Sequence, residues 1–192
     1  MNNLYFPICA VFINILILIV FYSKKRFKGD ETRAYSYLII TAFLESSLAC
    51  ILVILMNLYG KPSYIYNLHR IDYILMLFWT WAIFNYVSIV SINNNKKLRD
   101  KLNKITLIFN VVISISFFFL KVNVINENGI IDTNGEAMNV LFFVLTLYVV
   151  LIIILVLKTL FKNFKSSDNK KFIPLLFLAI LGAVSLLIRS IA

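Results

Sequence analysis

The chain has 192 residues, of which 61% are hydrophobic, 15% aromatic and 15% charged, with a formal net charge of +10. An average soluble domain is roughly 45–50% apolar and about 25% charged, so this composition excludes a soluble enzyme, a disulfide scaffold and a disordered tail. Apolar runs of about 20 residues separated by short polar stretches predict a chain that crosses a bilayer several times.

Six segments are long and apolar enough to span a membrane as helices, because each rises about 1.5 Å per residue across a core of roughly 30 Å. The predicted fold is therefore all-α, a polytopic transmembrane helical bundle forming a single domain over residues 1–192. The six predicted spans are 4–22, 35–59, 68–92, 105–122, 138–157 and 172–192.

Basic residues cluster in the connections that follow the first, third and fifth spans. Lys and Arg favour the cytoplasmic side, so these loops are predicted inside and the N-terminus outside. The charge then records orientation and attraction to anionic lipid, and nucleic acid is not an expected partner. Fifteen of the 19 basic residues lie there: Lys24, Lys25, Arg26, Lys28, Arg33, Lys96, Lys97, Arg99, Lys101, Lys104, Lys158, Lys162, Lys165, Lys170 and Lys171.

One outer connection has the pattern of a small β-hairpin near residues 122–133. Two β-branched runs, 122–125 and 130–133, flank Asn128-Gly129, which is a strong hairpin-turn signal. We expect this hairpin to lie over the outer ends of the fourth and fifth spans.

Glu45 lies about 15 Å from the inner end of its span, near the bilayer midplane. Asn14, Thr80 and Thr146 fall at a similar depth. One interpretation is a structural layer in which Glu45 hydrogen-bonds Asn14 and sets the register of the helices. The other is a buried switch, since ionisable groups inside a membrane are candidates for function.

A second polar group lies at the outer surface. His69, Asp72 and Tyr73 share one helix face at i, i+3 and i+4, and Arg189 of the last span reaches a similar level. An aromatic belt with snorkelling charges explains these residues. The alternative is the mouth of a ligand pocket that opens outward under the hairpin.

Several loop motifs resemble the N-terminal membrane region of Firmicutes-type sensor histidine kinases. They are NLYGKPSYIY at 57–66, RIDY at 70–73, KVNVINENGIID at 121–132 and IRS at 188–190. The resemblance implies a seven-helix input domain, a homodimer in the full-length protein, and cytoplasmic kinase domains after the membrane region. The chain's one histidine is His69, at an outer helix end, so catalysis is not expected within this chain, which is interpreted as part of a longer sensor.

The predicted function is thus a membrane input domain of a two-component sensor that receives an unknown ligand, without a metal or organic cofactor. Two alternatives remain. A transporter or channel subunit would need a continuous polar path across the bilayer, and a structural membrane protein would tolerate replacement of Glu45, Asp72 and Arg189 with no loss beyond stability.

Overall fold

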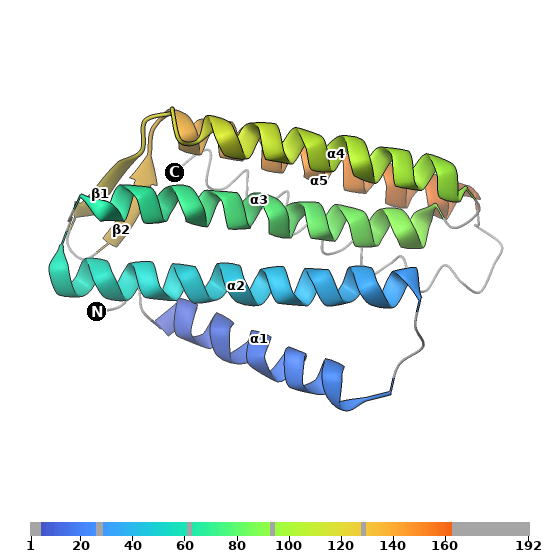
Figure 1. The fold of residues 1–192 in the computed structure, drawn as a ribbon, viewed down its shortest axis with the longest axis horizontal. Coiled ribbons are helices and arrows are strands. Elements are labelled where there is room, and N and C mark those ends of the chain that lie inside the picture. The colour runs from blue at the N-terminus through green and yellow to red at the C-terminus, as the bar shows by residue number, and fades with distance from the viewer. Residues whose placement is uncertain (1–4, 26–28, 61–62, 93–94, 128–129, 163–192) are drawn as a thin grey trace.

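The structure is a computed structural model that describes residues 5–25, 29–60, 63–92, 95–127 and 130–162. Within these ranges the chain forms five α-helices and one two-stranded antiparallel hairpin (Figure 1). In chain order they are α1 (Tyr5–Ser23), α2 (Asp30–Tyr59), α3 (Tyr64–Ser91), α4 (Lys96–Ser116), β1 (Asn123–Glu127), β2 (Ile130–Asn134) and α5 (Glu136–Lys162).

Four of the described helices are long and apolar enough to cross a membrane: α1, α2, α3 and residues Glu136–Phe161 of α5. They confirm four of the six predicted spans, 4–22, 35–59, 68–92 and 138–157, and mark the chain as a membrane protein. Six spanning helices are not supported. The predicted span 172–192 lies outside the described residues, and the fourth differs from its prediction.

The prediction of a span over residues 105–122 was wrong in its boundaries. Helix α4 begins at Lys96, where the Asn95 side chain accepts a hydrogen bond of 3.1 Å from the amide of Leu98. Lys, Leu and Arg are good helix formers, so the charged stretch joins the helix although it is too polar for an apolar span. At the other end α4 stops at Ser116, and the chain turns through Phe117–Leu120 toward β1.

The helices pack around α3, which contacts α2, α4 and α5, whereas α1 packs on α2 (Figure 1). Its buried side chains recur every three or four residues, so they form a continuous stripe along the helix. The stripe includes Ile65, His69, Tyr73, Leu77, Thr80, Phe84 and Val87. In α1, by contrast, Phe21 is the one residue described as buried, and side chains such as Phe6 and Phe12 are exposed, as expected for a helix facing lipid.

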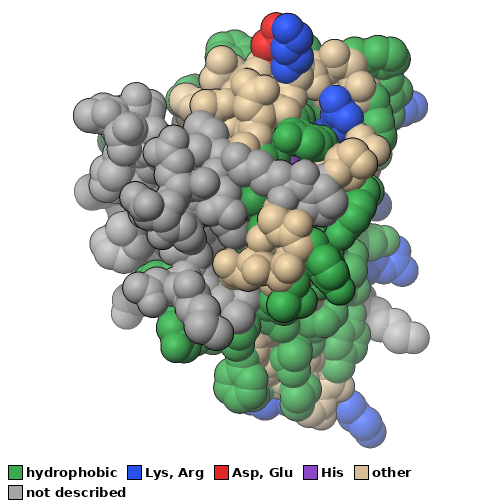
Figure 2. All heavy atoms as spheres, turned by 90° about the vertical axis from the view of Figure 1, so that its left-hand side faces the viewer, with side chains coloured by type: hydrophobic (Ala, Val, Ile, Leu, Met, Phe, Trp, Pro, Cys, Tyr) green, Lys and Arg blue, Asp and Glu red, His purple; other side chains and the backbone are tan. Residues whose placement is uncertain are grey.

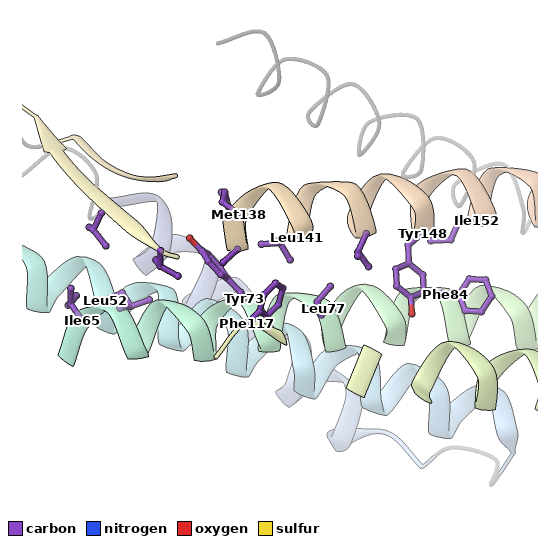
Figure 3. Close-up of a cluster of buried hydrophobic side chains, with 14 of the residues drawn as sticks. Leu52, Ile65, Tyr73, Leu77, Phe84, Phe117, Met138, Leu141, Tyr148 and Ile152 are labelled. Carbon is purple, nitrogen blue, oxygen red and sulfur yellow. The ribbon is translucent and has the colours of Figure 1, made fainter. Parts of the chain in front are cut away.

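The core lies between α2, α3, α5 and the segment after α4 (Figure 3). Tyr73 meets Phe117 edge-on with ring centroids 5.9 Å apart, and Phe84 meets Tyr148 at 5.6 Å. Lipid is as apolar as these side chains, so close packing and polar contacts, more than a hydrophobic driving force, hold such a bundle together.

The hairpin is confirmed close to its predicted position. Asn123 pairs with Asn134 and Glu127 with Ile130, in an antiparallel register that leaves two residues between the strands. We call the end of the bundle that carries this hairpin and the α2–α3 connection the hairpin end, and the opposite end, with the α1–α2 and α3–α4 connections, the basic end (Figure 1). Seen along the bundle from the hairpin end, hydrophobic side chains form much of the visible periphery (Figure 2).

Candidate functional site

A cavity of about 160 Å³ opens at the hairpin end, between α2, α3, β2 and α5. We call it the hairpin-end cavity. Its wall is mostly apolar, with a few polar groups from α3 and β2, which is the usual make-up of a small-molecule site. It is lined by Ala49, Leu52, Val53, His69, Asp72, Tyr73, Met76, Thr133, Met138 and Leu141.

The structure brings three of the predicted outer-face residues, His69, Asp72 and Tyr73, into the wall of this cavity. Their spacing along α3 places them on one face, and the rings of His69 and Tyr73 have centroids 6.4 Å apart. His69 is only 6% exposed. Its Nε2 atom and the Oδ1 atom of Asp72 are buried and have no hydrogen-bond partner among the described residues.

Glu45 lies beside the cavity without lining it. It is one helical turn before Ala49 on α2, on the same face, and α2 packs against α3, which carries Asp72. Neither carboxyl group belongs to a salt bridge in the described part of the chain.

Arg70, which is two positions before Asp72 on α3, forms its hydrogen bonds away from Asp72. It donates from Nη1 to Oδ1 of Asn67 at 2.8 Å and from Nη2 to the carbonyl of Leu120 at 3.3 Å, which ties α3 to the segment before β1. Arg189, the predicted partner of Asp72, lies outside the described residues, so that pairing stays a prediction.

The predicted midplane layer is not assembled as one site. Asn14 donates to Oγ of Ser46 at 2.9 Å and to the carbonyl of Ala42 at 3.3 Å, so the predicted bond between Asn14 and Glu45 is replaced by one to the next residue of α2. Thr80 and Thr146 each bond a carbonyl of their own helix, and Thr146 is exposed. The contact of Asn14 with α2 does serve helix packing, which is the structural role considered for this layer.

Sequence reasoning missed a buried polar group that joins α3, α4 and α5. Asn110 donates from Nδ2 to the carbonyl of Leu77 at 3.1 Å and accepts at Oδ1 from the hydroxyl of Tyr148 at 2.8 Å. The same hydroxyl lies 3.2 Å from the carbonyl of Thr106. The available signal was an amide within an apolar run, because polar side chains at such positions usually bond across helices.

A second missed group lies at the basic end, where the lysines and arginines were interpreted only as an orientation signal. Arg99 of α4 is buried and pairs through Nη2 with Oδ2 of Asp30 of α2 at 2.7 Å, and through Nε with Asp100 at 3.2 Å. Nearby, Asn103 of α4 accepts from Ser88 at 2.8 Å and donates to Asn85 at 2.6 Å, both on α3. These contacts fasten α4 to α2 and α3.

Within the described ranges, no three or more His, Cys, Asp or Glu side chains lie close enough together to hold a metal ion. No protein-family model matches the chain, and no curated protein or solved structure is significantly similar to it. The function is therefore inferred from the geometry of the sites themselves.

Proposed function

We propose that this chain is the membrane input domain of a bacterial two-component sensor kinase, and that a small ligand entering the hairpin-end cavity from outside the cell is its signal. The observation that supports this most directly is that His69 and Asp72 both line the cavity, while His69 Nε2 and Asp72 Oδ1 are buried without hydrogen-bond partners among the described residues. A buried polar atom without a hydrogen bond costs about 1–3 kcal/mol, so two of them beside an open cavity favour a site that a ligand completes.

The path for a signal runs through α2 and α3. Both helices line the cavity at the hairpin end, and both are fastened to α4 at the basic end, α2 through Asp30 and α3 through Ser88 and Asn85. A ligand shifts such a system only if it binds one helix arrangement more tightly than another. The polar side chains at the basic end are either hydrogen-bonded to a given partner or not. A small change in helix packing would therefore make these side chains exchange partners, and the contacts would not deform gradually.

Filling the cavity by mutation tests this proposal without a known ligand. Ala49→Phe adds a ring that occupies the cavity from α2. Spin labels on cysteines at Glu31 and Lys97, both exposed at the basic end, would report the α2–α4 distance in a chain whose native cysteines are replaced by alanine. We expect Ala49→Phe to shift that distance distribution.

The matched control is Ile51→Phe, which adds volume two residues along α2 at a side chain that is 48% exposed. It should leave the distance distribution unchanged. If Ala49→Phe also leaves it unchanged in a chain that remains folded, the cavity is not coupled to the basic end and the sensor proposal fails.

The kinase part of the proposal has its own test in the gene. We expect the reading frame beyond Ala192 to encode a seventh apolar segment, a histidine-containing dimerisation domain and an ATP-binding domain. A stop codon there would contradict the kinase assignment.

A further inference from the structure

We propose that the ligand of the hairpin-end cavity is a small organic cation, an ammonium ion that carries an apolar substituent. This inference rests on the proposed function of the cavity as a ligand site and names the chemistry that the site would select. Its basis is the placement of the Asp72 carboxyl group, the His69 imidazole and the Tyr73 ring around a largely apolar space.

The charged side chain in the wall of the cavity is acidic. Asp72 lines the cavity, and Glu45 is one helical turn before the lining residue Ala49 on the same face of α2. No salt bridge involves either residue within the described ranges, and Arg70 is engaged by Asn67 and Leu120. A carboxylate in a low-dielectric setting attracts a cation more strongly than the same group would in water.

The imidazole of His69 and the ring of Tyr73 also suit a cation. His69 lines the cavity, and its Nε2 atom is buried without a partner among the described residues, so a ligand that reached this nitrogen would meet a hydrogen-bond acceptor in the Nδ1–H tautomer. The ring of Tyr73 lies beside it, with centroids 6.4 Å apart, and a cation within about 6 Å of such a ring gains further stabilisation. An ammonium ion could thus contact a carboxylate, an imidazole and an aromatic face together.

The rest of the wall is apolar, and the cavity is small. Leu52, Met138 and Leu141 offer an apolar surface that would not stabilise a hydrated metal ion. A cavity of roughly 150 Å³ holds a molecule about as large as benzene, and this one measures about 160 Å³. The space therefore suits an ammonium group joined to a short alkyl chain or a single ring.

Benzylammonium is a suitable probe, with benzyl alcohol as its neutral counterpart. Equilibrium binding of both would be measured on the full chain in lipid nanodiscs at neutral pH. We expect the cation to bind at least tenfold more tightly than the alcohol. Asp72→Asn should abolish that preference while retaining binding of the alcohol, which shows that the cavity is intact, and Glu45→Gln should reduce it.

Glu31→Gln serves as the control, because Glu31 is an exposed acid at the basic end of α2 and belongs to neither salt bridge of the described ranges, so both affinities should stay unchanged. Equal binding of cation and alcohol would overturn the cation assignment but leave a ligand cavity. Binding of the cation only after Arg189→Gln would also overturn it, since Arg189 would then be the native counter-ion. Absence of binding by either probe would overturn the inference, whereas the Ala49→Phe distance measurement uses no probe and judges the proposed function separately.

Discussion

The hydroxyl of Tyr148 illustrates how single polar atoms hold this bundle together. It lies 2.8 Å from the Asn110 side chain and 3.2 Å from the Thr106 carbonyl, so one side chain of α5 reaches two groups of α4. The amide of Asn110 in turn reaches the carbonyl of Leu77 on α3. Three helices therefore meet at one buried amide, where bilayer lipid offers no alternative hydrogen bonds.

Removing that hydroxyl should weaken the bundle measurably. Tyr148→Phe keeps the ring against Phe84 but leaves Oδ1 of Asn110 without its donor, and we expect a loss of about 1 kcal/mol in the free energy of unfolding in SDS titrations. Combining it with Asn110→Leu should cost less than the sum of the two single changes. Thr146→Val, on the same helix but exposed and bonded to its own backbone, should change stability by under about 0.5 kcal/mol. Full additivity would show that the contact contributes nothing.

At the same scale, sequence reasoning identified which residues were unusual better than which residues they touch. The outer group His69, Asp72 and Tyr73 followed from helical spacing, and the structure places all three in one cavity wall. The partner of Asn14 was wrong by one position, because a choice between adjacent residues of α2 depends on helix rotation, which hydropathy does not encode. The Asn110–Tyr148 contact depends on the relative placement of two helices and was out of reach for the same reason.

Among the elements, the hairpin depends on one glycine. Gly135 has φ +117° and joins β2 to α5, and a Cβ atom there would stand 2.7 Å from the carbonyl oxygen of Lys121. That oxygen accepts a hydrogen bond of 3.2 Å from the amide of Ala137. This bond holds the start of α5 against the segment that enters β1. The hairpin and the cavity wall at Met138 share this anchor.

Gly135→Ala should therefore destabilise the protein through both strain and collision. We expect a loss of at least about 2 kcal/mol in the free energy of unfolding, because the backbone conformation is unfavourable for alanine and the facing atom is backbone, which cannot move aside easily. Gly60→Ala separates the two effects, since Gly60 has φ +72° and nothing within 4 Å of its added Cβ. It should cost about 1 kcal/mol. Equal losses for the two variants would mean that the contact with Lys121 is unimportant.

The boundaries of the elements show where hydropathy stops being informative. The apolar segments located α1, α2, α3 and α5 to within a few residues, except where charged or polar residues extend a helix, as at Asp30 and Lys162. For α4 the apolar run and the helix diverge: the run continues to Val122, whereas the helix ends at Ser116. Hydropathy reports the environment of a residue, and only hydrogen-bonding geometry decides where a helix ends.

For the molecule as a whole, the two ends differ in character in a way that predicts sidedness. The basic end presents Lys24, Lys25, Lys96 and Lys97, and the hairpin end presents the two-stranded hairpin. The preference of Lys and Arg for the cytoplasm predicts that the hairpin end is external.

Single cysteines introduced into a cysteine-free chain test this orientation. Asn134→Cys, exposed on β2, should react with a membrane-impermeant thiol reagent added to intact cells. Lys97→Cys and Lys25→Cys, both exposed, should react only after the membrane is permeabilised. The reverse pattern would place the hairpin inside and would close the cavity to signals from outside the cell.

The mixed character of α4 also bears on how the protein is made. Its first nine residues contain six charged side chains, and its apolar half contains Asn110, which is satisfied only by α3 and α5. A segment of this kind partitions poorly into lipid on its own, since each charged residue opposes insertion. We therefore expect α4 to enter the bilayer after α3 and together with α5, so the order in which helices leave the ribosome becomes part of the folding mechanism.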